Sequence, residues 1–152
     1  MKSNLTTTQR RELKRFVEAQ EGVYASVLEE LAAGKKMSHW MWFVFPQLKA
    51  LGKSPTAQYF GLESKDEALA YWQNEVLRER LKQCTKLVLS VSDKTAHEIF
   101  GFPDDMKFRS CMTLFSQIEP EEPIFRQALE RFFGGQPDAS MLELLQVPAA
   151  CG

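Results

Sequence analysis

The sequence predicts an all-α fold, a single compact and irregular helical domain of about seven or eight helices, several of them short. Three observations support this class. Apolar residues recur at spacings of three and four, helix-capping residues divide the chain, and the alternating or β-branched runs typical of strands are almost absent. We expect residues 1–146 to form this domain and residues 147–152 to form a loose C-terminal tail.

The beginning of the chain predicts two helices joined at a glycine. Thr8 is a candidate N-cap of the first helix, Gly22 interrupts the apolar pattern, and Gly34 ends the second helix. The apolar residues expected on the faces of these helices are Leu13, Phe16, Val17, Val23, Val27 and Leu31. We expect Lys35 and Lys36 to be the solvated end of the second helix.

Capping residues also mark the next two helices. Ser54 precedes Pro55, which predicts an N-cap followed by proline at the first position of a short helix ending at Phe60. Ser64 and Glu67 match the capping box, in which side chain and backbone satisfy each other's free polar groups, and they predict the start of the following helix.

The clearest helix is expected from Asn74 to Val91. Its apolar residues recur at spacings of four, three, four and three, and they are Leu77, Leu81, Cys84, Val88 and Val91. Such residues form one stripe along a helix, and the charged residues between them then face water. We therefore expect this stripe to pack into the core.

Further helices are expected over residues 95–101, 103–115, 123–133 and 140–145. Thr95 and Glu98 form a second capping box, Pro103 and Pro123 each begin a helix, and Gly134-Gly135 follows the end of one. Across the whole chain, the residues expected to be buried are Phe16, Leu28, Leu77, Leu81, Val88, Phe100, Leu114 and Phe132.

Composition excludes several classes of function. The chain has 152 residues, of which 44% are hydrophobic and 26% charged, as in an average soluble globular domain. Its 19 basic and 20 acidic residues give a net charge of -1, so we expect no nucleic-acid partner bound by charge alone. The longest strongly apolar stretch, residues 40–46, is too short to span a bilayer, so no membrane partner is expected.

The cysteines and histidines argue against a metal or cofactor. Cys84, Cys111 and Cys151 are widely spaced, with no C-x-x-C pair, so we expect free thiols in a cytoplasmic protein. His39 and His97 are the two histidines, which makes a multi-histidine metal site unfavourable. We expect no cofactor, because nucleotide-binding glycine loops and metalloprotease motifs are absent from the sequence.

Residues 35–48 are the densest concentration of residues suited to a binding site. Ser38, His39, Trp40, Trp42 and Gln47 combine two indole rings with hydrogen-bonding groups. Indole rings line small-molecule pockets well, and a histidine near neutral pH can act as an acid or a base. The alternative is a core segment with a satisfied histidine.

Residues 99–115 form the second candidate segment. On a helix that begins near Pro103, Lys107 and Ser110 share a face, and both suit an anionic group. The alternative is a capped helix with a solvated charge pair, since Asp105 and Arg109 are spaced to pair at i,i+4.

These two segments lead to one functional hypothesis. We expect a cytoplasmic domain that binds a small polar or nucleotide-like ligand in one cleft, with Trp40 or Trp42 stacking its planar part. His39 and Gln47 would contact polar edges, and Lys107 with Ser110 would hold an anionic group. Catalysis is left open, with His39 the only good acid/base candidate. The alternative is a non-enzymatic interaction or structural module whose aromatic cluster is core, with no identified protein partner.

The same segments carry a family resemblance. The matching stretches include Ser38-His39-Trp40-Met41-Trp42-Phe43, Phe45-Pro46-Gln47, Ile99-Phe100-Gly101, Pro103-Asp104-Asp105-Met106-Lys107 and Met112-Thr113-Leu114-Phe115. With them the chain resembles the domain-of-unknown-function 1810 family, which implies a mainly α-helical, bacterial-type protein without an established activity. Some members are labelled calpastatin. A calpain inhibitor is a disordered repeat protein, and this globular composition does not support that label.

Overall fold

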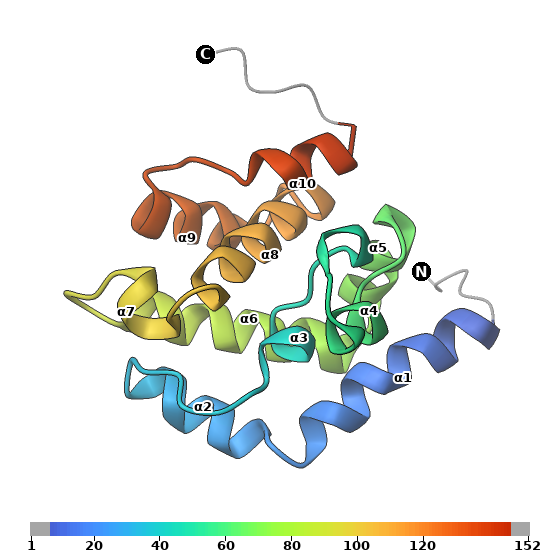
Figure 1. Cartoon of the computed structure of the whole chain (residues 1–152), viewed down its shortest axis with the longest axis horizontal. Helices are drawn as coiled ribbons and strands as arrows, with labels where there is room; N and C mark the ends of the chain where they lie inside the picture. Colours follow the sequence, from blue (N-terminus) through green and yellow to red (C-terminus); the bar gives the residue numbers. More distant parts are fainter. Residues whose placement is uncertain (1–6, 147–152) are drawn as a thin grey trace.

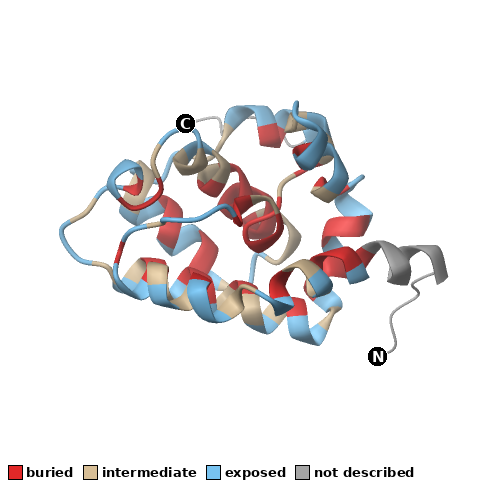
Figure 2. Ribbon diagram, turned by 60° about the horizontal axis from the view of Figure 1, so that its bottom comes forward, coloured by how far each residue is buried: buried red, intermediate tan, exposed pale blue. Residues whose placement is uncertain are grey.

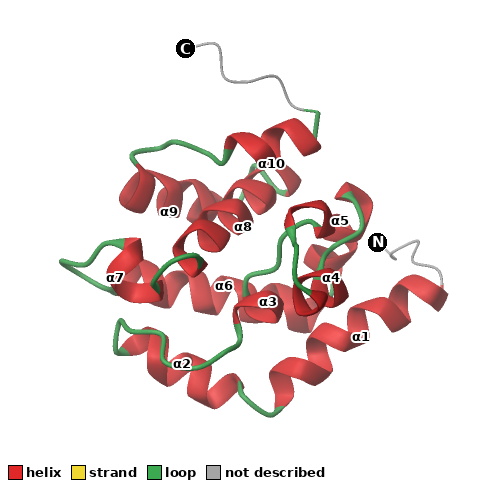
Figure 3. Cartoon of the chain, viewed as in Figure 1, coloured by secondary structure: helices red, strands yellow, loops and turns green. Residues whose placement is uncertain are grey.

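The chain folds into helices joined by short loops, as expected from the capping and periodicity of the sequence. The computed structural model describes residues 7–146, with side chains from residue 13 onward, and no strand occurs in that part (Figure 3). In chain order the helices are α1 (Thr7–Glu21), α2 (Tyr24–Ala32), α3 (Met41–Val44), α4 (Pro55–Phe60), α5 (Lys65–Gln73), α6 (Glu75–Ser90), α7 (Ala96–Phe100), α8 (Asp104–Ile118), α9 (Pro123–Phe133) and α10 (Ala139–Leu144). A 3₁₀ turn, η1 (Lys49–Leu51), lies between α3 and α4.

The all-α class is confirmed, and the helices of the described part outnumber the expected seven or eight. The helix of the described part that none of the expected ranges contains is α3. The helix α3 spans four residues, which is too short for a periodic apolar pattern to predict it.

The helix α6 lies in the middle of the fold. Figure 1 shows it with α1 and α2 on one side and α8, α9 and α10 on the other, and it packs against both α2 and α9. The predicted stripe is buried at Leu77, Leu81, Cys84 and Val88, while Val91 is half-buried at the end of the helix. Buried residues gather on the inward sides of the surrounding helices as well (Figure 2).

Most of the predicted core residues are buried. Phe16, Phe100 and Leu114, like every residue of the α6 stripe except Val91, belong to the hydrophobic core cluster. The prediction was wrong in degree for Leu28 and Phe132, which are partly exposed and pack against the edge of that cluster. Both lie on helices at the outside of the fold, where one side of an apolar residue still meets water.

The predicted helix caps are present in part. Ser54 Oγ accepts a hydrogen bond from the Ala57 amide at 3.1 Å, as expected at the start of α4. The capping box of α7 is complete, since the Glu98 amide donates to Thr95 Oγ1 at 3.1 Å and the Thr95 amide donates to Glu98 Oε1 at 2.8 Å. Thr8 is not an N-cap, because α1 already begins at the preceding residue.

Of the two hydrogen bonds in the capping box expected at the start of α5, only the one accepted by the Ser64 side chain forms. Ser64 Oγ accepts from the Glu67 amide at 3.3 Å. The Glu67 carboxylate accepts from the Glu63 amide at 2.7 Å and lies 3.6 Å from an Arg15 guanidinium nitrogen. The buried arginine on α1 therefore holds Glu67 in a tertiary contact that the local pattern does not predict.

Within residues 7–146, no helix combines the length and apolar character that crossing a membrane requires.

Candidate functional site

The loop that leads into α3 is organised by the carboxylate of Glu30 on α2. Its Oε1 accepts hydrogen bonds from the Met37 amide at 2.7 Å, the Ser38 amide at 3.1 Å and Trp40 Nε1 at 2.9 Å. Its Oε2 accepts from Ser38 Oγ at 2.6 Å. Burial would raise the pKa of Glu30, but these hydrogen bonds stabilise the ionised form and lower the pKa to about 2. Ser38 and Trp40 thus have protein partners that fix the loop.

Trp40 lies in the core. Only 1% of the residue is exposed, and its ring packs against Phe45 at a centroid distance of 6.3 Å. The Lys36 ammonium lies 5.1 Å from the ring centroid and 2.9 Å from Asp104 Oδ2. The expectation of a solvated Lys36 was wrong, because this ion pair and this ring draw its side chain inward to 8% exposure.

The polar residues of α8 also have partners within the fold. Ser110 Oγ lies 3.1 Å from both the Met106 carbonyl oxygen and Asp138 Oδ2, so it supports the turn that begins α10. Asp105 and Arg109 do not pair as expected. Asp105 Oδ2 lies 3.4 Å from His97 Nδ1, and Arg109 Nε donates to the Gln136 carbonyl oxygen at 2.9 Å.

Three of the seven predicted site residues meet around a small hollow. It is lined by Met41, Trp42, Phe45, Gln47, Ala57, Phe60, Gly61 and Lys107, and we call it the Trp42 hollow. Its volume is about 10 Å³, close to the space of one water-sized group. His39, Ser38 and Ser110 are not among the lining residues, and His39 is exposed on the loop before α3.

The indole of Trp42 gives this hollow its chemical character. Trp42 Nε1 is buried, and no described residue accepts a hydrogen bond from it. A buried donor without a partner costs about 1–3 kcal/mol. The Lys107 ammonium lies 5.2 Å from the centroid of the Trp42 ring, so one ring face is already covered by a cation. The hollow is therefore lined by an indole whose buried N–H has no partner among the described residues, and a positive charge lies close to the ring.

Contacts from distant elements position this group. Gln20 Nε2 on α1 donates to the Phe43 carbonyl oxygen at 2.6 Å and holds α3 from one side. On the other side, Phe45 packs edge-on against Phe108 at 5.1 Å, next to Lys107 in α8. These two contacts bring Trp42 and Lys107 together although 65 positions separate them in the chain.

The floor of the hollow depends on a close backbone approach. Gly61 follows α4, and a Cβ atom built there would lie 2.4 Å from Lys49 Cα. The Leu62 amide beside it donates to the Gln47 carbonyl oxygen at 3.0 Å. Gly61 is not among the predicted site residues, and its one local signal is its position directly after a short capped helix.

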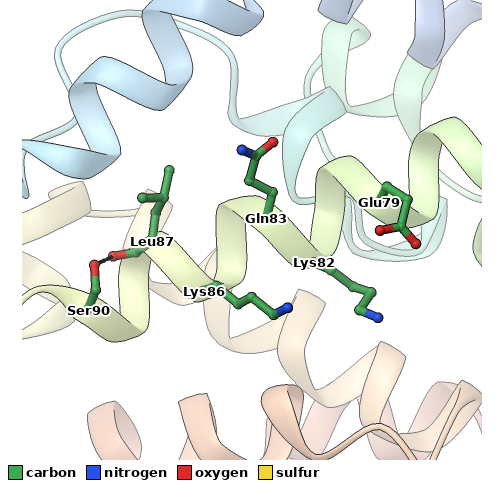
Figure 4. A pocket seen from close by; sticks show the side chains of 6 residues that line it. All are labelled: Glu79, Lys82, Gln83, Lys86, Leu87 and Ser90. Carbon is green, nitrogen blue, oxygen red and sulfur yellow. Dashed lines mark hydrogen bonds between the residues drawn. The ribbon is translucent and has the colours of Figure 1, made fainter.

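A larger surface groove runs along α6 and has a different character. Its volume is about 420 Å³, and its lining residues are Glu79, Lys82, Gln83, Lys86, Leu87 and Ser90, all from one helix (Figure 4). Lys82 Nζ lies 3.3 Å from Glu122 Oε1, and Gln83 Oε1 accepts from the Tyr24 hydroxyl at 2.6 Å. Several of its polar groups are thus used by the fold.

No cluster of three or more histidine, cysteine or acidic side chains that could hold a metal ion occurs among the described residues. Cys84 and Cys111 are free and buried.

Comparison with known proteins gives a family and a fold relative. A family model described as "Protein of unknown function (DUF1810)" matches residues 10–145. The crystal structure of the conserved hypothetical protein Rv1873 from Mycobacterium tuberculosis is similar, with 50% sequence identity and a TM-score of 0.88. The match covers 90% of this chain and 97% of that chain. A comparison with curated proteins gave no match.

Proposed function

Because this chain belongs to the DUF1810 family of proteins of unknown function, we propose its activity from its own side chains: it binds a small polar molecule at the Trp42 hollow. One observation carries the proposal. Trp42 Nε1 is a buried donor with no acceptor among the described residues, and an acceptor atom of a ligand would satisfy it.

The lining of the hollow supports this type of ligand. Gln47 adds an amide that both donates and accepts, and Lys107 adds an ammonium group with a side chain 23% exposed. Apolar side chains from α3 and α4 make up most of the remaining lining. A few polar groups among apolar walls are typical of small-molecule sites. At this size, one group of the ligand enters the hollow and the rest lies outside it.

The proposal is for binding alone. His39, the acid/base candidate from the sequence, is exposed and is not part of the lining. Of the two indoles in the first candidate segment, Trp40 is buried and bonded to Glu30, so the proposal rests on Trp42.

A thermal-shift screen with a matched variant tests the proposal. Trp42→Phe keeps an aromatic ring and removes the N–H, while Tyr59→Phe on exposed α4 surface is the control. A ligand at about 100 times its Kd stabilises the native state by about 2.7 kcal/mol, which raises the Tm of a chain of this length by about 5–10 °C. We expect compounds that stabilise the wild type and Tyr59→Phe but not Trp42→Phe. Hits that stabilise all three proteins equally contradict this site.

The competing proposal is a structural or interaction module whose aromatic cluster is core. The burial of Trp40 favours this structural reading for Trp40 itself. It predicts that Trp42→Phe lowers the Tm and that no compound in the screen distinguishes the variant from the wild type.

We also propose that the protein acts in a bacterial cytoplasm. Two free thiols in the core, Cys84 and Cys111, suit a reducing compartment, and the similar solved structure comes from a mycobacterium.

A further inference from the structure

We propose that the group bound in the Trp42 hollow is a carboxylate on a short apolar stem. This inference rests on the proposed function and names the chemical class of its ligand. It follows from the donors of the hollow, from the charges around Lys107 and from the shape of the space.

The polar side chains among the lining residues favour a negatively charged acceptor. Trp42 Nε1 and Lys107 Nζ are both donors with no lone pair to offer a ligand, and Gln47 can add two further N–H groups. Among the described lining residues Lys107 is the one charged side chain. A carboxylate presents two acceptor oxygens in one plane, so one group can accept from both the indole and the ammonium.

The ion pairs of Asp104 leave Lys107 as the available cation. Asp104 Oδ2 lies 2.9 Å from Lys36 Nζ, whereas Asp104 Oδ1 lies 3.6 Å from Lys107 Nζ. The Lys36 side chain is 8% exposed and that of Lys107 is 23% exposed, so Asp104 is the close partner of the more deeply buried lysine. Two ammonium groups share one carboxylate, which leaves a net charge of +1 in this cluster. A ligand carboxylate at Lys107 would balance it, and Asp104 would keep Lys36 as its partner.

The size and lining of the hollow indicate which group of the ligand enters it and what the rest of the ligand is. A space of about 10 Å³ suits one water-sized group, such as a carboxylate oxygen, better than a whole tetrahedral phosphate. Met41, Ala57 and Phe60 surround the polar groups with apolar surface. The stem lies outside the hollow, where the half-buried Phe60 offers apolar surface, and this favours a hydrocarbon stem over a second polar group.

Titration of the wild-type protein with sodium butyrate, butyramide and inorganic phosphate tests the inference. The readout is the ¹⁵N–¹H signal of each indole, with the Trp42 signal assigned through Trp42→Phe. Trp40 serves as an internal control, because its N–H is already bonded to Glu30. We expect butyrate to shift the Trp42 signal with an affinity about tenfold higher than butyramide, since a charge-assisted hydrogen bond is roughly twice as strong as a neutral one. The Trp40 signal should stay in place.

A charge variant adds a second measurement. In Lys107→Met, butyrate should bind no more tightly than butyramide, whereas the control Lys86→Met on the exposed side of α6 should keep the wild-type difference. If Lys107→Met does not fold, the comparison of butyrate with butyramide on the wild type still decides the question.

The outcomes separate the two proposals. Equal affinities for butyrate and butyramide at Trp42, or a shift with phosphate alone, overturn the carboxylate class and leave binding at the Trp42 hollow standing. The carboxylate class is also overturned if a neutral compound from the thermal screen shifts the Trp42 signal and butyrate does not. If no anion, amide or screening hit shifts it, the hollow binds water only and both proposals fail.

Discussion

At the scale of single residues, the Glu30 carboxylate accepts four hydrogen bonds from one loop. It joins α2 to the loop before α3 through donors from Met37, Ser38 and Trp40. One of these donors is the indole of a core residue, so the loop and the core are held by the same carboxylate. Replacing that carboxylate should loosen the approach to α3 more than a change at a neighbouring glutamate.

We expect Glu30→Gln to lower the free energy of unfolding at pH 7 by about 1–2 kcal/mol, because an amide replaces one accepting oxygen by a donor. The pKa of Glu30 falls from its usual 4.5 to about 2 in the folded protein. The stabilisation is therefore complete above about pH 4.5 and is lost as the pH falls toward 2. Urea unfolding at several pH values should show the gap between wild type and variant closing over that window.

The control for this experiment is Glu29→Gln, since Glu29 is exposed on the same helix. It removes the same charge and should leave the unfolding curve nearly unchanged. A gap that persists at pH 2, or a control that behaves like Glu30→Gln, would show that the effect is general and does not come from these hydrogen bonds.

The two core thiols give a prediction about reactivity. Burial raises the pKa of Cys84 to about 12 and also raises the pKa of Cys111 well above its usual value. The reactive thiolate is therefore scarce at neutral pH, and both sulfurs are also shielded from reagents. Against Ellman's reagent, Cys84 and Cys111 should react slowly in the native protein and rapidly in urea.

Cys151 lies outside the described residues, and the sequence predicts that it reacts first. The measurement is therefore repeated in a Cys151→Ser background, where the fast phase should disappear. Fast labelling of Cys84 in this native variant would be incompatible with its place in the α6 stripe.

At the scale of elements, the central helix α6 carries the packing of both sides of the fold. Leu81 is 1% exposed in the middle of its apolar stripe. Leu81→Ala should lower the free energy of unfolding by about 2–5 kcal/mol, through lost apolar contact and the cavity left behind. Chemical denaturation followed by circular dichroism measures this loss.

The matched control on this helix is Lys86→Ala, whose side chain is exposed on the opposite side. It should change the stability by no more than about 0.5 kcal/mol. Similar losses for the two variants would mean that the stripe does not face the core.

Local patterns predicted most of these elements, and short-range chemistry explains why. An N-cap such as Ser54 and a capping box such as Thr95 with Glu98 are formed by residues three apart. A short stretch of sequence is therefore enough to predict them. The helix α3 was not predicted, because four residues are too few to show the helical period of apolar residues. At Ser64 the cap is incomplete, and the Glu67 carboxylate contacts the Glu63 amide and Arg15, which comes from another helix.

At the scale of the whole molecule, the candidate site was only partly predictable. Trp42, Gln47 and Lys107 were selected for their chemistry, and the fold brings them to one hollow. The same chemistry also selected Ser38 and Ser110, which bond within the fold. Whether a polar residue lines the hollow or bonds within the fold depends on partners far along the chain, such as Asp138 for Ser110. Local spacing in the sequence does not specify these partners.

Long-range contacts also tie the first two helices to the centre of the fold. Arg80 on α6 donates to Gln20 and Glu21 of α1, and the Lys94 ammonium after α6 donates to the Gly34 carbonyl oxygen beyond α2. The Arg80–Gln20 pair and the Lys94–Gly34 pair are each 60 positions apart.

This separation has a consequence during synthesis on the ribosome. At about 5–20 residues per second, 60 residues take about 3–12 seconds to add. During that interval α2 has left the exit tunnel, or is leaving it, before α6, the helix that it packs against. The nascent chain therefore presents Val27 and Leu31 of α2 to chaperones and proteases until α6 emerges. A ribosome that stalls before residue 90 would hold a product in which α2 lacks the helix that it packs against most extensively.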